Sequence, residues 1–324
     1  MTHEASTAAR SSVAGCRALV TGASGFVGAT LTRALLAHGV DVHAVVRRGS
    51  NKSRIAEIEP RLSLHEADLT SRDAVRQAVD AARPDVVFHL AKHRGNPMQM
   101  DTRAALRTNT EGVLNLLDAV AGRPLKGFVH VGSSFEYAFG SAPLNETDRL
   151  EPATVHGATK AAATLLCQQA ARQGRMPLVI LRAFTVYGPW EDRNRLVPTA
   201  IRAALEGGEI DLTGPDLRHD WVLVDDVVEA LLRAAAIDLP PGEIVNVATG
   251  REATNQEVVA LIGELTGRPV RVRVGAYPKR EWDSAHWVAD VGKAERVLGW
   301  KAAHSLREGL AATIAWFRAN DHAY

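Results

Sequence analysis

Apolar residues fall along this chain in two alternating patterns. Short apolar runs are separated by segments in which apolar residues recur every three or four positions. The runs, most clearly the segment 85–91, are typical of buried strands, and the intervening segments are typical of amphipathic helices. The runs predict strands at 17–21, 40–46, 62–66, 85–91, 127–131 and 178–182. The periodic segments predict helices at 26–38, 71–82, 100–120 and 155–172, the second with Ser71 as N-cap.

Repeated strand–helix units predict a parallel, doubly wound sheet that binds its ligand at the carboxyl ends of the strands. The rhythm changes after Tyr187-Gly188-Pro189. Beyond it, short helices (196–205, 225–236, 255–266) mix with short strands (210–212, 221–224, 243–246, 270–274). We therefore predict an α/β fold in three parts. They are a disordered tail at 1–14, a dinucleotide-binding Rossmann domain at 15–188, and a smaller mixed α/β lobe at 189–324 that mainly binds substrate.

A glycine-rich turn, Gly22-Ala23-Ser24-Gly25-Phe26-Val27-Gly28, connects the first strand to the first helix. This arrangement directs backbone N–H groups and a helix N-terminus at a phosphate. One glycine permits the tight turn, one lets the backbone approach a pyrophosphate, and one lets the helix pack close to the sheet. The spacing GxxGxxG differs from the common GxGxxG, but its place between a strand and a helix predicts a dinucleotide site.

The end of the second predicted strand bears on the choice of cofactor. An acidic residue there accepts the ribose 2′-OH of NAD, whereas an arginine accommodates the 2′-phosphate of NADP. This chain has Arg47 and Arg48, followed by Gly49-Ser50, and no carboxylate. Two guanidinium groups bind phosphate oxygens well, so we predict NADP, with NAD as the alternative. The competing interpretation is two solvated surface arginines.

Composition narrows the possible partners. The chain has 324 residues, 46% of them hydrophobic and 23% charged, with a net charge of +1. That charge gives no basic field for nucleic acid or an anionic membrane, and no segment approaches the ~20 apolar residues that span a bilayer. The N-terminal tail lacks the apolar core of a secretion signal. Cys16 and Cys167 have no metal-binding spacing, so we expect two buried thiols, no metal and a cytoplasmic location.

With these residues in view, the chain resembles the extended short-chain dehydrogenase/reductase family of nucleotide-sugar epimerases, dehydratases and ketoreductases. The resemblance covers nearly the whole chain, and its motifs follow the family's order. Besides the glycine turn, they are Ala67-Asp68-Leu69, His89-Leu90-Ala91, Thr108-Asn109-Thr110-Glu111-Gly112, Leu181-Arg182-Ala183-Phe184-Thr185-Val186-Tyr187-Gly188-Pro189 and Arg218-His219-Asp220-Trp221-Val222.

Further ligand contacts follow from these motifs and from their neighbours. The expected cofactor contacts outside the turn and the arginine pair are Asp68, Leu69, Leu90, Ala91, Lys92, Lys160 and Phe184. The expected substrate contacts are Lys92, His93, Thr185, Arg195 and Arg218. Lys92, His93 and Arg94 follow the fourth strand at its carboxyl edge, and Arg195 has a planar fork suited to phosphate. The resemblance implies that Arg218 pairs with the nucleotide diphosphate, while Thr185 replaces the family's usual Asn.

The resemblance also implies a reactive group of a Ser or Thr and a Tyr-x-x-x-Lys pair, which lies on one helical face. Ser133-Ser134 and Lys160 match it, but His156 stands at the tyrosine position. Three hypotheses follow. His156 acts as the acid and base, as a neutral imidazole can; or Tyr137 or Glu136, just after the fifth strand, transfers the proton; or His156 is a polar filler and the chemistry has changed.

The resemblance also separates the possible reactions. Sugar 4,6-dehydratases carry Asp-Glu where this chain has Phe135-Glu136, which argues against dehydration. We therefore predict an NADP-dependent oxidoreductase that reduces a keto group of a nucleotide-activated deoxysugar. An epimerase with a retained cofactor is the alternative, and a non-catalytic NADP-binding sensor or scaffold is the alternative of another class. A homodimer through the helices at 100–120 and 155–172 is the expected assembly.

Overall fold

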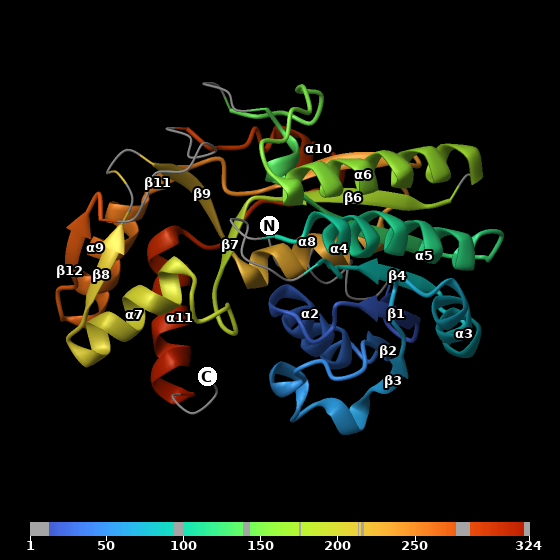
Figure 1. The fold of residues 1–324 in the computed structure, drawn as a ribbon, viewed down its shortest axis with the longest axis horizontal. Helices are drawn as coiled ribbons and strands as arrows, with labels where there is room; N and C mark the ends of the chain where they lie inside the picture. Colours follow the sequence, from blue (N-terminus) through green and yellow to red (C-terminus); the bar gives the residue numbers. More distant parts are fainter. Residues whose placement is uncertain are drawn as a thin grey trace.

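The computed structural model of this protein describes residues 13–93, 100–138, 143–174, 176–212, 214, 217–276 and 286–320. A seven-stranded, fully parallel sheet forms the centre of the described part (Figure 1). The strand order is β10-β6-β5-β4-β1-β2-β3. The strands are β1 Arg17–Thr21, β2 Asp41–Val46, β3 Ser63–Glu66, β4 Val86–His89, β5 Gly127–Ser133, β6 Leu178–Ala183 and β10 Glu243–Val247. The order reverses between β1 and β4, where such sheets form a ligand-binding crevice.

Helices cover both faces of this sheet, which confirms the predicted doubly wound fold. One face carries α2 Phe26–Ala37, α8 Val224–Ala236 and α10 Gly292–Leu298. The other carries α3 Arg72–Ala82, α5 Gly112–Val120 and α6 Val155–Gly174. Before α5 lie α4 Thr102–Leu106 and one π-helical turn, Arg107–Glu111. Short 3₁₀ helices occupy Ser53–Ile55, Glu59–Arg61 and Ser134–Glu136.

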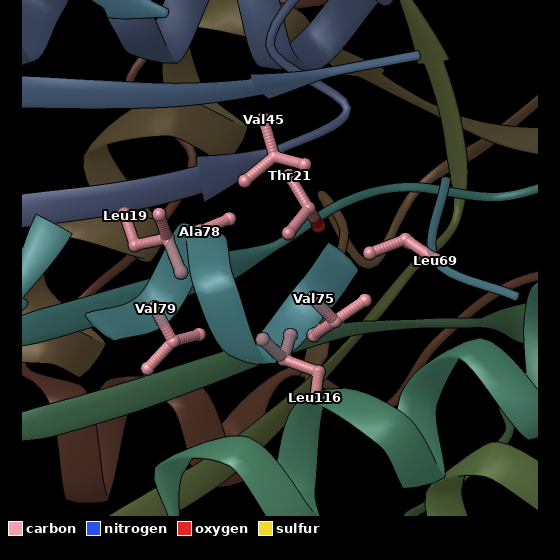
Figure 2. Close-up of a pocket in the computed structure, with 8 residues that line it drawn as sticks. All are labelled: Leu19, Thr21, Val45, Leu69, Val75, Ala78, Val79 and Leu116. Carbon is pink, nitrogen blue, oxygen red and sulfur yellow. The ribbon is translucent and has the colours of Figure 1, made fainter. Parts of the chain in front are cut away.

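Apolar side chains pack closely between the sheet and the second helical layer. Figure 2 shows a small space beside β1 and α3, lined by Leu19, Thr21, Val45, Leu69, Val75, Ala78, Val79 and Leu116. All these side chains except Thr21 are apolar, and the space is too tight to admit a ligand. It belongs to the core.

A second lobe lies beside the sheet, on the left in Figure 1. It contains a three-stranded sheet of β11 Glu252–Thr254, β9 Arg218–Leu223 and β7 Thr185–Tyr187, and a two-stranded sheet of β12 Arg271–Val274 and β8 Glu209–Leu212. The helices α7 Leu196–Glu206, α9 Asn255–Thr266 and α11 Leu306–Ala319 pack around a core of their own. This is the smaller mixed α/β lobe that the change in rhythm predicted.

The structure corrects the predicted partition of the chain in two places. The strand expected at 243–246 in the second lobe is β10, which pairs with β6 in the main sheet, because a short apolar run does not reveal which sheet it joins. The helix α8 likewise packs on the main sheet. At the other end, Val13 is buried in the core, so the folded part begins before the predicted boundary at residue 15. The rest of the predicted tail, 1–12, lies outside the described residues.

Trp190, in the loop before α7, contacts both parts of the molecule. The Arg33 guanidinium of α2 lies 4.8 Å from its ring centroid, and the Trp316 ring of α11 lies 4.9 Å away. Its carbonyl accepts a hydrogen bond from Arg54 Nε at 2.7 Å. The backbone of Trp190 has a φ of 69°, in the left-handed region that bulky residues rarely occupy.

Candidate active site

The glycine turn after β1 has the geometry of a phosphate site. Gly22 has a φ of 76°, and a Cβ there would lie 2.7 Å from the Ala91 backbone nitrogen. A Cβ on Gly28 would lie 2.0 Å from the Gly22 carbonyl oxygen. At the start of α2, Gly25 offers no side-chain cap and the first turn has no acidic residue. The N–H groups at this helix end are therefore available to an anion, and the residues present suit a dinucleotide pyrophosphate.

The segment after β4 lies beside this turn. Leu90 N donates to Thr21 O at 3.1 Å, and Ala91 N donates to the Thr21 hydroxyl at 3.4 Å. His93 N donates to Asn109 Oδ1 at 2.6 Å, while Asn109 Nδ2 donates to Thr159 Oγ1 of α6 at 2.9 Å. The buried Asn109 therefore ties the loop after β4 to the helix that carries Lys160. It occupies the π-helical turn, a feature frequent at functional sites.

Further predicted cofactor contacts lie just after β2 and β3. Arg47 and Arg48 are exposed there, as is Asp68, while Leu69 is buried. The pKa of Asp68 lies below its usual value: partial burial raises it, but hydrogen bonds from Thr70 and the charge of Arg47 outweigh that effect. Arg47 and Asp68 thus lie close enough to interact electrostatically.

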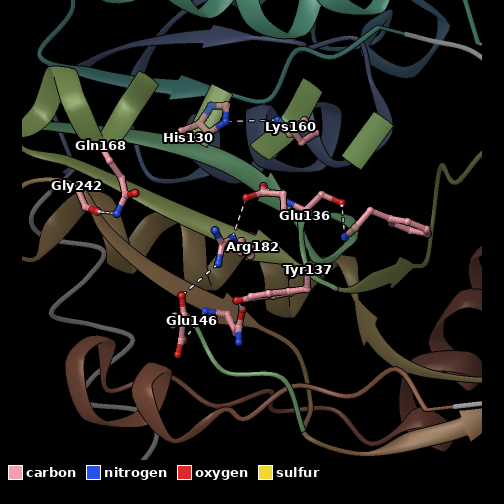
Figure 3. A network of polar contacts seen from close by, with 11 residues as sticks. His130, Glu136, Tyr137, Glu146, Lys160, Gln168, Arg182 and Gly242 are labelled. Carbon is pink, nitrogen blue, oxygen red and sulfur yellow. Dashed lines mark hydrogen bonds and ion pairs between the residues drawn. The ribbon is translucent and has the colours of Figure 1, made fainter. Parts of the chain in front are cut away.

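The turn after β5 is built on a buried ion pair. Glu136 accepts a hydrogen bond from the Ser133 backbone N–H at 2.7 Å, and the Ser133 hydroxyl accepts from Phe135 N at 3.2 Å. The second oxygen of Glu136 lies 2.8 Å from Arg182 Nε, with both side chains almost fully buried (Figure 3). Arg182 also lies 4.6 Å from the Tyr137 ring centroid. Both carboxylate oxygens of Glu136 thus have hydrogen-bond partners within the protein.

Tyr137 and Ser134 have equally definite partners. The Tyr137 hydroxyl donates to Asn246 Oδ1 at 2.7 Å, and burial raises the pKa of that phenol to about 12. The Ser134 hydroxyl accepts a hydrogen bond from Trp287 Nε1 at 3.0 Å, and its proton is therefore available to a ligand oxygen. The structure keeps Ser134 beside the site, whereas Tyr137 contributes to the network around Arg182.

His156 lies in the first turn of α6, against the turn after β5. A Cβ on the adjacent Gly157 would lie 2.1 Å from the Phe135 carbonyl oxygen, so this glycine allows the close approach. The Phe135 ring meets the His156 ring edge-on, with centroids 6.1 Å apart. No described residue forms a hydrogen bond with the buried Nδ1 of His156.

Burial lowers the pKa of His156 to about 3, and the charges of Lys92, Lys160 and Arg195 act in the same direction. The imidazole is therefore neutral at physiological pH. Lys160, one helical turn further along α6, is also buried. Burial lowers its pKa to about 8, against the opposing charge of Glu136.

The two arginines predicted to contact the substrate, Arg195 and Arg218, lie in the second lobe. Arg195 precedes α7 and lies 3.5 Å from the Glu191 carboxylate, whose pKa burial raises to about 7. Arg218, on β9, is partly exposed and lies 3.7 and 3.9 Å from the carboxylates of Glu252 and Glu257.

Comparison with known proteins agrees with this geometry. The sequence profile of the NAD dependent epimerase/dehydratase family matches residues 18–248, more than half of the chain. The chain belongs to this family. A UDP-glucose 4-epimerase of Mycolicibacterium smegmatis is 30% identical over 314 residues, covering 93% of this chain and 98% of the relative. A dTDP-glucose 4,6-dehydratase of Streptomyces griseus is 28% identical over 309 residues, covering 92% and 93%. The solved structure of MoeE5 in complex with UDP-glucose and NAD is 33% identical, with a TM-score of 0.83 over 94% of this chain and 99% of that chain.

The family resemblance predicted from the motifs is thus confirmed: the protein is an enzyme of the NAD-dependent epimerase/dehydratase family. Among the predicted cofactor residues of this family member, those that follow β1 and β4 lie at the carboxyl edge of the sheet, and Lys160 of α6 lies beside His130 of β5. Phe184 is buried against the Tyr137 ring, 6.5 Å away, and Thr185 begins β7. Arg94 lies outside the described residues.

Several residues that support the turn after β5 and Arg195 in this family member were not singled out from the sequence. Arg182 stands within an apolar strand, and a charged residue in such a run is a signal of a buried ion pair. Glu191 gave no such signal, because it stands among other polar residues of the sequence. Trp287 and Asn246 are distant in sequence from the residues they contact. The described residues hold no cluster of His, Cys, Asp and Glu suited to a metal, and none of their helices is long and apolar enough to cross a membrane.

Proposed function

We propose that this protein is an NADP-dependent oxidoreductase that reduces a keto group of a nucleotide-activated deoxysugar. The observation that carries the proposal is the arrangement at the carboxyl edge of the sheet. A glycine turn suited to pyrophosphate follows β1, the Ser134 hydroxyl follows β5, and His156 of α6 packs against the turn after β5, one helical turn before Lys160. The relatives named for UDP-glucose and dTDP-glucose support a nucleotide-sugar substrate.

The chain's own residues would divide the work as follows. The bound nicotinamide supplies the hydride. Ser134 donates a hydrogen bond to the substrate carbonyl, because its oxygen already accepts one from Trp287. His156, held neutral, donates a second hydrogen bond and passes that proton to the substrate oxygen as the hydride arrives; the imidazolate that remains is stabilised by the Lys160 charge and takes up a proton from solvent. The Lys160 ammonium group binds the cofactor ribose and stabilises negative charge that develops on the substrate oxygen.

The partners of Glu136 and Tyr137 argue for a supporting role for both residues. Glu136 uses both carboxylate oxygens on Ser133 and Arg182, and the Tyr137 proton is directed at Asn246. We therefore assign the proton transfer to His156. Dehydration is not favoured, since Phe135 provides no second carboxyl group beside Glu136.

An epimerase with a retained cofactor is the second candidate, because the same residues serve both directions of hydride transfer and a 4-epimerase is among the relatives. The deciding experiment incubates the purified protein with NADPH and 4-keto-6-deoxy nucleotide sugars and, separately, with UDP-glucose and dTDP-glucose. A reductase oxidises NADPH in proportion to the keto sugar consumed, as followed by nicotinamide absorbance. Epimerisation of a nucleotide sugar without net cofactor oxidation contradicts the reductase and supports the epimerase. No conversion in either set, with NADP still bound, supports a sensor or scaffold.

The preference for NADP rests on Arg47 and Arg48, whereas MoeE5 is described with NAD. Replacing both arginines by serine removes two cationic partners of a 2′-phosphate. We expect the NADP dissociation constant, measured by calorimetry, to rise at least tenfold, about the effect of losing one charge-assisted hydrogen bond. The NAD constant is expected to change little. Equal weakening of both cofactors would contradict NADP selection by this pair.

We further propose that two copies associate through α4, α5 and α6. Three leucines on these adjacent helices are unusually exposed: Leu106 by 52%, Leu114 by 44% and Leu165 by 54%. An apolar group of this kind on neighbouring helices is typical of an interface between copies.

A further inference from the structure

A buried row of polar side chains crosses three adjacent strands below Lys160. Thr21 of β1, His89 of β4 and His130 of β5 are register partners in neighbouring strand pairs. All three are fully buried, on the face of the sheet that α6 covers. The mechanism above uses neither histidine.

The contacts along this row are continuous. The Thr21 hydroxyl lies 2.6 Å from His89 Nδ1. The His89 and His130 rings stack, with centroids 5.2 Å apart and planes 21° apart. Nε2 of His130 lies 3.5 Å from the Lys160 Nζ (Figure 3). Each ring is therefore held by its neighbour, and the row ends on the ammonium group.

The chemistry of the pair defines which atom donates. A buried ammonium group has three donors and no acceptor, and leaving them without partners is costly. Burial holds the pKa of His130 well below its ordinary value, and the positive charge of Lys160 lowers it further. The ring is therefore neutral. Because an ammonium group can only donate, we assign the ring proton to Nδ1, which has no hydrogen-bond partner among the described residues, so that Nε2 accepts from Lys160.

We propose that His130 is a positioning residue: its Nε2 accepts a hydrogen bond from the Lys160 ammonium group and holds that side chain against the sheet, while Thr21 and His89 hold the His130 ring. The contact favours the charged form of Lys160. Its importance for turnover rests on the proposed function, but the contact itself exists without substrate. His130 of β5 thus gives Lys160 a fixed neighbour in the sheet.

Other groups also face Lys160 and remain in every variant tested. Glu136 after β5 and Cys167 on α6 favour its charged form, and Lys92 after β4 opposes it. His156, on the preceding turn of α6, feels the Lys160 charge. A difference between variants at position 130 therefore reports the contribution of His130.

The experiment follows the titration of Lys160 itself by NMR, in full-length protein labelled with ¹³C and ¹⁵N at its seven lysines. The Lys160 signal is the one absent from Lys160→Arg. His130→Phe keeps a ring stacked on His89 but has no acceptor. We expect the Lys160 midpoint, near pH 8 in the parent, to fall by about one pH unit, the size expected for one hydrogen bond to a charged group.

Two further variants test the cause. His130→Gln retains an acceptor and is expected to recover most of the shift. His65→Phe is the matched control, because His65 of β3 also stacks on a histidine, His43 at 5.1 Å, far along the same sheet; we expect no shift. If His130→Phe does not fold, His130→Asn, too short to reach Nζ, replaces it.

An unchanged Lys160 midpoint in a folded His130 variant would overturn the proposal, as would an equal shift in the control. No substrate is present, so a failure of the proposed function leaves this test intact. With an active preparation, the alkaline limit of kcat is expected to move to lower pH together with the NMR midpoint, since the reaction needs Lys160 charged. A limit that stays in place would contradict the link to turnover.

Discussion

At the scale of single residues, His156 and Lys160 show how environment changes familiar side chains. Burial and three nearby positive charges lower the pKa of His156 to about 3, so its imidazole is neutral at physiological pH. The same burial brings the Lys160 pKa to about 8, within reach of physiological pH. A neutral imidazole and a buried lysine therefore occupy one helical face.

Substituting His156 tests its assignment directly. His156→Phe keeps a ring against Phe135 but removes the donor, and we expect kcat on the sugar substrate to fall by about 10²-fold or more, as for loss of an acid–base group. His156→Tyr restores the family pattern and is expected to retain activity well above the Phe variant. Steady-state kinetics measure both, with the NADP dissociation constant as the control for an intact crevice. Full activity in the Phe variant would contradict the assignment.

At the scale of elements, β5, its turn and α6 form one unit. The buried Arg182–Glu136 pair fixes the turn from below, and Gly157 allows the helix to approach it from above. Ser134 and His156 come from different elements, yet their relative position follows from these contacts. The buried pair Glu136 and Arg182 thus supports the turn that carries Ser134.

Removing one member of the buried pair is expected to be costly. Arg182→Met leaves the Glu136 carboxylate buried without its partner, so we expect a loss of roughly 3–5 kcal/mol in the free energy of unfolding, measured with urea. The double variant Glu136→Gln, Arg182→Met removes both charges of this pair and is expected to recover much of the loss. The exposed pair Arg307–Glu264 is the control, and Arg307→Met is expected to cost far less. Equal losses in the buried and exposed variants would contradict this account.

The helices and strands also show which parts of the fold could be predicted from the sequence. Periodicity predicted the β1–α2 unit, α3 and the strand of the His89-Leu90-Ala91 motif, because each buries one regular face or run. It misplaced β10, since an apolar run carries no information about its partner strand. The ion pair that supports the turn after β5 could not be predicted, because Glu136 and Arg182 are 46 positions apart and meet only through the register of β5 and β6. The glycine turn between β1 and α2 could be predicted because its signal is local to one turn.

At the scale of the whole molecule, the exposed leucines of α4, α5 and α6 test the proposed association. We expect the parent to sediment as a dimer and the double variant Leu114→Lys, Leu165→Lys to sediment as a monomer, because charge opposes burial of this surface. Ile237→Lys, at an exposed apolar position outside these helices, is the control and is expected to leave the dimer unchanged. A monomeric parent, or a dimeric double variant, would contradict the interface.

Trp190 has a consequence for how this chain can diverge. A bulky residue with a φ of 69° carries a backbone cost of about 1 kcal/mol or more, which its contacts with Arg33, Arg54 and Trp316 must offset. Glycine at this position avoids the backbone cost but loses the ring contacts with Arg33 and Trp316. Any other residue keeps the backbone cost and loses these ring contacts as well. Orthologues that keep Arg33 and Trp316 are therefore expected to keep tryptophan at this position, although a partly exposed loop residue would ordinarily drift freely.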